Sequence, residues 1–138
     1  MASVSFPITS VVAGFMAIFI MVLNVQFSMR QIQLGDDVFK DMTDGAGDDK
    51  LNRRRIAFMS AAFNIPFSII LLGLIEVNGA TRIQVLILAA ILILCRILHS
   101  IGCYYQTLPY IRSLAFVIQF AYYTVCGVWL MFGVYYLL

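Results

Sequence analysis

Four long apolar segments constrain this chain more than any other feature of its sequence. They cover approximately residues 8–27, 56–77, 82–101 and 111–135. A helix of roughly 20 residues crosses a hydrocarbon layer about 30 Å thick. Helices satisfy their own backbone hydrogen bonds inside such a layer. The sequence therefore predicts an all-α integral membrane protein, an antiparallel bundle of four transmembrane helices that forms a single domain over residues 1–138.

The composition supports a membrane protein and argues against several other classes. The chain is 62% hydrophobic and 12% charged, whereas soluble domains are about 45–50% apolar and about 25% charged. Nucleic-acid binding is not indicated, because no basic patch is interleaved with aromatic residues. Cys95, Cys103 and Cys126 lack metal-ligand spacing and the chain has one histidine, so we expect no metal site.

The polar stretch over residues 31–55 is expected to be a solvated loop, and its charge predicts an orientation. Six of the nine Lys and Arg residues lie in this stretch or at its edges: Arg30, Lys40, Lys50, Arg53, Arg54 and Arg55. The positive-inside rule places such a loop on the cytosolic, matrix or stromal side, with both termini opposite. The first apolar segment is too long for the core of a signal peptide and has no basic residue before it, so we expect a mature helix.

The link between the second and third segments carries clear boundary signals. Asn78 and Gly79 are typical turn residues, and Thr81 is placed to cap the third helix. Glu76 and Arg82 stand on either side of this turn and could form an ion pair. We therefore expect a tight helical hairpin here.

Ionisable side chains within or beside the last two apolar segments are the best candidates for a functional site. Arg96 and His99 are three residues apart in the third segment, so they share one helix face. Arg112 and Ser113 begin the fourth segment at the same predicted depth, which is also that of Arg30. A charge in hydrocarbon costs at least about 2.5–3.5 kcal/mol. Either Arg96 snorkels to the headgroups while His99 bonds a backbone carbonyl, or the group lines a pocket for an anionic ligand.

Several short motifs, in order along nearly the whole chain, resemble those of the MAPEG family, the membrane-associated proteins in eicosanoid and glutathione metabolism. Its short bacterial-type members are the most similar. The motifs are Pro7-Ile8-Thr9 with Ala13-Gly14, Leu34-Gly35-Asp36-Asp37, Glu76-Val77-Asn78-Gly79-Ala80, Arg96-Ile97-Leu98-His99 with Gly102, and Ile111-Arg112-Ser113.

The resemblance implies an antiparallel four-helix bundle that assembles as a homotrimer, with glutathione bound between subunits. It implies that Arg112 activates the thiol of glutathione and that Ser113 assists. Arg96, with His99 and Arg30 as further candidates, would then contact glutathione or a lipid headgroup. A guanidinium suits the first role because it stabilises the nucleophilic thiolate.

The second segment departs from the family pattern, which has an Arg, an Asn four residues later and a Glu three residues after that, shortly before a Pro. When the pattern is anchored on Pro66, its three polar positions fall on Ile56, Ser60 and Phe63. Arg55 and Asn64 are each one residue out of place, which is about 100° of helix rotation. We therefore expect them to point elsewhere, with Asn64 hydrogen-bonded across a helix interface.

Two functions from different classes remain open on these residues. The degenerate glutathione site favours a non-catalytic lipid-binding protein or a structural subunit of a membrane assembly. The alternative is a glutathione-dependent transferase or peroxidase that acts on lipophilic electrophiles. The expected partners are membrane lipids and either further copies of the chain or other membrane subunits.

Overall fold

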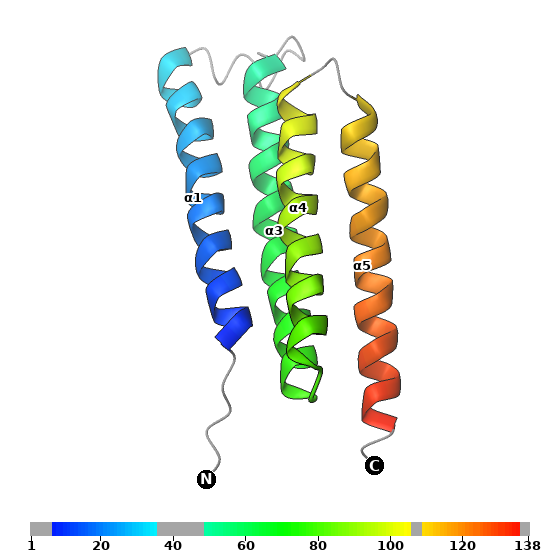
Figure 1. Ribbon diagram of the computed structural model, residues 1–138. Coiled ribbons are helices and arrows are strands. Elements are labelled where there is room, and N and C mark those ends of the chain that lie inside the picture. Colours follow the sequence, from blue (N-terminus) through cyan, green and yellow to red (C-terminus); the bar gives the residue numbers. More distant parts are fainter. Residues whose placement is uncertain (1–6, 36–48, 106–108, 136–138) are drawn as a thin grey trace.

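The computed structural model describes residues 7–35, 49–105 and 109–135, and these residues form four long helices (Figure 1). The helices are α1 (Pro7–Leu34), α3 (Asp49–Val77), α4 (Arg82–Tyr104) and α5 (Pro109–Tyr135). All four are long and apolar enough to cross a membrane. The predicted all-α fold with four transmembrane helices is thus confirmed.

The helices alternate in direction, so the bundle has two distinct ends. We call the end where α1 begins and α5 ends the terminal end, and the opposite end, where α1 ends and α3 begins, the loop end (Figure 1). The stretch over residues 31–55, expected to be a loop, is helical at both edges, since α1 runs to Leu34 and α3 starts at Asp49. Asp49 favours this early start because a carboxylate in the first turn interacts well with the helix dipole.

The turn between α3 and α4 is built as its sequence predicts. Gly79 has a φ of 83°, which a residue with a side chain adopts only at a cost. The Thr81 side chain accepts a hydrogen bond from the backbone of Gln84, and the Gln84 side chain accepts one from the backbone of Thr81. This reciprocal capping box confirms Thr81 as the N-cap of α4.

Glu76 bonds the start of α1 and does not form the ion pair with Arg82 that its position allowed. Its carboxylate accepts hydrogen bonds from the backbone N–H groups of Ile8 and Thr9, at 3.1 and 3.0 Å. The first N–H groups of a helix have no partner within it and carry partial positive charge. The Glu76 carboxylate provides acceptors for two of these N–H groups, which gains more than pairing with an arginine that water already solvates. Glu76 therefore fixes the start of α1 to the end of α3.

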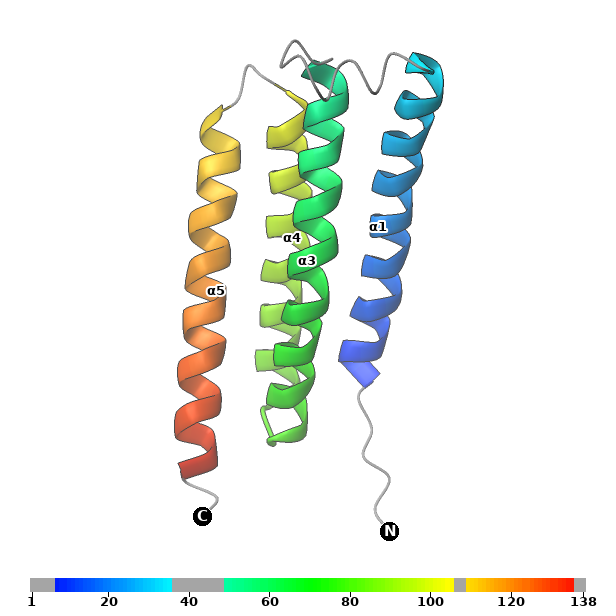
Figure 2. The same ribbon diagram turned by 180° about the vertical axis from the view of Figure 1, so that it is seen from behind.

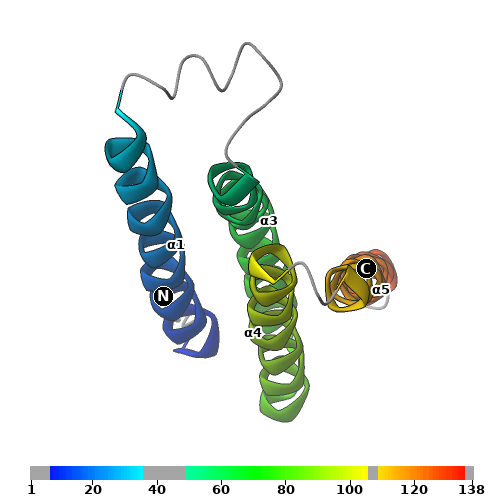
Figure 3. The same ribbon diagram turned by 90° about the horizontal axis from the view of Figure 1, so that it is seen from above.

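Helices α3 and α4 lie at the centre of the bundle, with α1 and α5 on opposite sides of this pair (Figures 1, 2 and 3). Both outer helices pack against both central ones, and α1 does not touch α5. The buried apolar cluster draws on all four helices and is concentrated toward the terminal end. Its members are Val12, Met16, Leu23, Ala61, Ile65, Leu72, Ile75, Val85, Leu88, Ala89, Leu92, Tyr122 and Cys126.

Candidate functional site

A network of polar side chains crosses the middle of the bundle between α3 and α5. Ser68 is its centre: the Ser68 hydroxyl donates to the carbonyl of Asn64 at 2.8 Å and accepts from the Gln119 amide at 3.3 Å. The hydroxyl of Tyr122 donates to the Ser68 carbonyl at 3.4 Å. The hydroxyl of Tyr123 donates to the Asn64 side-chain oxygen at 3.1 Å, which confirms the predicted bond of Asn64 across a helix interface.

The network borders a partly open cavity of about 170 Å³, which we call the buried cavity because its polar lining residues Arg96 and His99 are buried, although Phe116 and Phe120 at its edge are exposed. Its lining comes from three helices and comprises Ser60, Asn64, Cys95, Arg96, His99, Ala115, Phe116, Gln119, Phe120 and Tyr123. Arg96 is 3% exposed and His99 is 7% exposed. The Arg96 side chain therefore does not extend to the headgroups in this bundle, because it is enclosed between helices. The snorkelling interpretation is wrong. His99 Nε2 lies 3.6 Å from the Cys103 thiol, not against a backbone carbonyl.

A larger depression of about 780 Å³, the open groove, lies beside the buried cavity toward the loop end. Its lining residues are Asp49, Asn52, Arg53, Ile56, Gly102, Cys103, Tyr105, Arg112, Ser113, Phe116 and Val117. Arg112 and Ser113 are both exposed. Phe116 lines both spaces, so its ring stands where they adjoin.

Gly102 allows the close approach of α4 and α5 that positions Arg112. A Cβ atom on Gly102 would lie 2.7 Å from the backbone nitrogen of Arg112 and 2.9 Å from its Cα. Contacts this short with backbone atoms require a helix to move. Small residues play this part at helix interfaces in membranes, where they let backbones come together.

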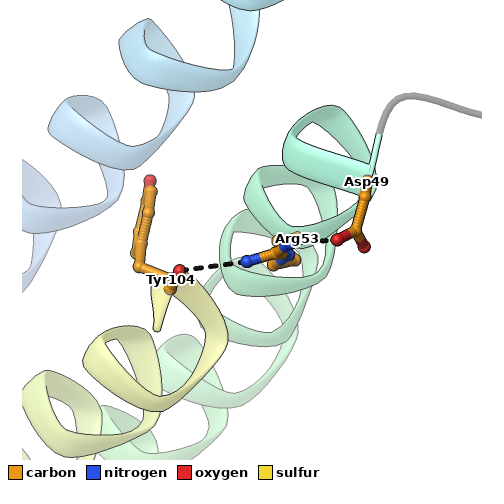
Figure 4. A network of polar contacts seen from close by, with 3 residues as sticks. All are labelled: Asp49, Arg53 and Tyr104. Atoms are coloured by element: carbon orange, nitrogen blue, oxygen red, sulfur yellow. Dashed lines mark hydrogen bonds and ion pairs between the residues drawn. The ribbon is translucent and has the colours of Figure 1, made fainter. Parts of the chain in front are cut away.

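Arg53 ties α3 to the end of α4 at the edge of the open groove. Figure 4 shows its guanidinium between the carboxylate of Asp49, one turn earlier, and the backbone oxygen of Tyr104. The bond to Tyr104 is 3.4 Å long. The ring of Tyr104 extends from α4 toward α1, where its hydroxyl bonds the side chain of Gln26 (Figure 4). These contacts join three helices at the loop end.

The structure brings the predicted site residues together as two pairs. Arg96 and His99 line the buried cavity, whereas Arg112 and Ser113 line the adjoining open groove. Arg30 lies on α1, across the central helices from α5, and lines neither space. Its guanidinium bonds the Gln33 side chain at 3.2 Å.

The three positions where the family pattern has polar residues face different surroundings. Ile56 lines the open groove opposite Arg112, and Ser60 lines the buried cavity. Phe63 is 72% exposed on the outside of α3. Asn64 was expected to point elsewhere, but it lines the same cavity as Ser60. The reason is that residues four apart share a helix face.

Sequence reasoning missed the polar network, although the sequence contains a signal for it. Polar residues recur at helical spacing as Ser60, Asn64 and Ser68 on α3 and as Gln119 and Tyr123 on α5. Two polar stripes on membrane helices indicate faces that meet each other, because lipid offers them no hydrogen bonds.

Comparison with known proteins places the chain in a family. No curated protein and no solved structure gives a match. Within the described residues there is no group of three His, Cys, Asp or Glu side chains able to hold a metal ion. The sequence profile of the MAPEG family, which includes glutathione transferases and related enzymes, matches residues 6–132. This match and the four membrane-length helices show that the chain is a multi-pass membrane protein that belongs to the MAPEG family.

Proposed function

We propose that this protein is a non-catalytic member of its family that binds the anionic headgroup of a membrane lipid in the open groove. The observation that carries the proposal is the amphipathic lining of this groove. Arg112 lines the groove and is exposed, and Ile56, Phe116 and Val117 supply an apolar wall. A guanidinium forms paired hydrogen bonds with phosphate or carboxylate. Basic pockets between membrane helices suit lipid headgroups.

Glutathione fits this groove only in part. The tripeptide carries two carboxylates and an amine, and the α3 wall offers Ile56 where the family pattern has an arginine. Asp49, the carboxylate that lines the groove, already pairs with Arg53. Each polar ligand group left without a partner costs about 1–3 kcal/mol. A lipid with one anionic headgroup and apolar chains has fewer polar groups that need a partner on the same surface.

The proposal includes assembly with other membrane components. The outward faces of α1 and α5 carry large exposed apolar residues, among them Val11, Ile32 and Met131. These faces suit lipids, further copies of the chain in a homotrimer, or other subunits of a complex. The mass of the protein extracted in a mild detergent distinguishes a homotrimer from a mixed assembly. We also place the loop end on the cytosolic, matrix or stromal side, on the basis of its arginines.

Lipid binding is tested with the purified protein in nanodiscs that contain phosphatidylglycerol or phosphatidylcholine. Native mass spectrometry should show retained phosphatidylglycerol on the wild type and about ten- to hundredfold weaker retention on Arg112→Gln, since a charge-assisted hydrogen bond contributes about 1.5–3 kcal/mol and each ~1.4 kcal/mol is a factor of ten. Arg55→Gln is the matched control, because Arg55 is exposed on α3 at the same end and does not line the groove. Saturable binding of glutathione at millimolar concentration or below, without lipid selectivity, would contradict the proposal.

A glutathione-dependent transferase or peroxidase is the alternative, favoured by one observation. Arg112 and Ser113 lie side by side in a groove wide enough to admit a thiol and a lipophilic electrophile. In that reaction Arg112 would hold the thiol as the thiolate. Conjugation of a generic electrophile should then occur in the wild type and in Arg55→Ala and be lost in Arg112→Ala. Equal inactivity of the wild type and Arg112→Ala would rule this function out.

A further inference from the structure

We infer that the buried cavity binds a small monovalent anion, such as chloride, as the counter-charge of Arg96. The Arg96 side chain is 3% exposed, and its Nε atom is buried without a hydrogen-bond partner. Among the described residues, no Asp or Glu lines the cavity. This site is separate from the open groove, so the inference does not rest on the proposed lipid binding.

The physical argument begins with the charge of Arg96. An arginine side chain stays protonated in proteins, so it cannot avoid the cost of burial by losing its proton. A buried charge that lacks a partner is strongly destabilising, and buried charges in proteins are therefore paired. The cavity must hold negative charge close to the Arg96 guanidinium.

That negative charge does not come from the acidic residues of the four apolar segments. Of the seven Asp and Glu residues, only Glu76 lies in one of these segments, and its carboxylate is bonded to the backbone of Ile8 and Thr9 at the terminal end. Asp49 pairs with Arg53 at the loop end. The other five belong to the polar stretch 36–48. Among the described residues, no carboxylate is therefore placed to pair with Arg96, and we take the counter-charge to come from outside the protein.

The size and lining of the cavity select the kind of anion. Its volume of about 170 Å³ is close to the ~150 Å³ of an engineered cavity that holds benzene, so an occupant of a few heavy atoms fills it. Asn64, Gln119 and Tyr123 supply amide and hydroxyl groups, while Phe116 and Phe120 supply aromatic rings whose edges are weakly positive. One guanidinium balances one negative charge, which favours a halide over phosphate.

An anion in this place would hold three helices together. Arg96 belongs to α4, Ser60 and Asn64 to α3, and Gln119 and Tyr123 to α5. A ligand that binds only the folded state raises its stability in proportion to the logarithm of the ligand concentration once the site is filled. The inference therefore predicts a halide-dependent melting temperature.

The experiment compares thermal unfolding of the full-length protein in nanodiscs, in sodium chloride, sodium bromide or sodium gluconate at one ionic strength. Chloride and bromide should raise the melting temperature by several degrees, with an increase that becomes logarithmic in halide concentration once the site is filled, while gluconate, which is too large for the cavity, should not. Arg96→Gln should lose the halide effect and Arg112→Gln should keep it. Equal melting temperatures in the three salts, or a halide effect that persists in Arg96→Gln, would overturn the inference.

A second measurement on the wild type keeps the test decisive if Arg96→Gln does not fold. Crystals grown in bromide should give an anomalous difference peak within hydrogen-bond distance of the Arg96 guanidinium. Absence of such a peak at a bromide concentration that raises the melting temperature would reject the site. Stabilisation by glutathione with no response to halide would also reject it, because Arg96 would then be paired with a carboxylate of the tripeptide.

Discussion

The terminal end and the loop end of this bundle are built on different principles. At the terminal end, Glu76 satisfies the first N–H groups of α1, Thr81 caps α4, and most of the buried apolar cluster fills the space between the helices. Toward the loop end the space between α3, α4 and α5 contains the buried cavity and the open groove. Among the described residues, neither Arg96 nor Arg112 forms an ion pair there, since Asp49, which lines the groove with Arg112, pairs with Arg53.

The difference shows how a small membrane bundle holds its shape while it keeps room for a ligand. Closed polar contacts and dense apolar packing at one end fix the helices, so the other end tolerates hollow space lined by cationic side chains. The polar network around Ser68 lies at the border of the two regions. Substitutions on each side of this border should therefore differ in what they disturb.

The largest effect is expected for Gly102→Ala, which acts on the loop half. The new methyl group would lie 2.7 Å from the Arg112 backbone nitrogen, so α5 must shift away from α4. Overpacking of this kind costs about 1–3 kcal/mol, and lipid retention through Arg112 should fall with it. Thermal unfolding and native mass spectrometry measure the two effects. Gly127→Ala is the control, since its Cβ would meet no atom within 4 Å; equal behaviour of the two variants would contradict the close approach.

Ser68→Ala tests the border between the halves. It removes the hydroxyl that accepts from Gln119 and donates to the Asn64 carbonyl. Hydrogen bonds between membrane helices contribute on average about 0.6 kcal/mol and at most about 1.7 kcal/mol, so we expect a loss of about 1 kcal/mol in the free energy of unfolding. Thr124→Ala should change stability less, because the exposed Thr124 hydroxyl bonds only its own helix at Phe120. A larger loss for Thr124→Ala would show that the network does not hold α3 to α5.

Glu76→Gln weakens the closed end without changing its shape. The carboxylate at the start of α1 interacts with the helix dipole and with two N–H groups, and losing its charge should cost about 0.3–1 kcal/mol. Hydrogen exchange at Ile8 and Thr9 should accelerate while exchange in α5 stays unchanged. Gln84→Ala, which removes one side of the capping box of α4, is the matched control and should leave α1 exchange as in the wild type.

Asp49→Asn should have the smallest effect, although it breaks the ion pair with Arg53. The Asp49 side chain is largely exposed, so solvent and salt screen both its interaction with the dipole of α3 and its ion pair, and exposed ion pairs contribute about 0–1 kcal/mol. A shift of the denaturation midpoint too small to resolve is the expected result. A loss comparable with that of Gly102→Ala would mean that the loop end is held as firmly as the terminal end.

The fold follows from sequence more completely than the site does. Apolar length predicted the four spans, and Asn78, Gly79 and Thr81 predicted the turn before α4, because these signals act over a few neighbouring residues. The separation of the candidate site residues into a cavity pair and a groove pair depends on packing between helices. The sequence of one helix does not determine that packing. Because α1 lies across the central helices from α5, Arg30 is far from the other candidate site residues. The orientation of α5 places Arg112 in the open groove, whereas Arg96 on α4 lines the buried cavity.

The contact between Glu76 and the start of α1 also sets an order of events during synthesis. Ile8 and Glu76 are separated by 68 positions in the chain. The ribosome therefore completes α1 well before Glu76 is made, so the first amide groups of α1 gain this partner only later. Docking of α1 becomes complete only when the α3–α4 hairpin has inserted. Of the four described helices, α1 is thus made first, and its position is fixed late.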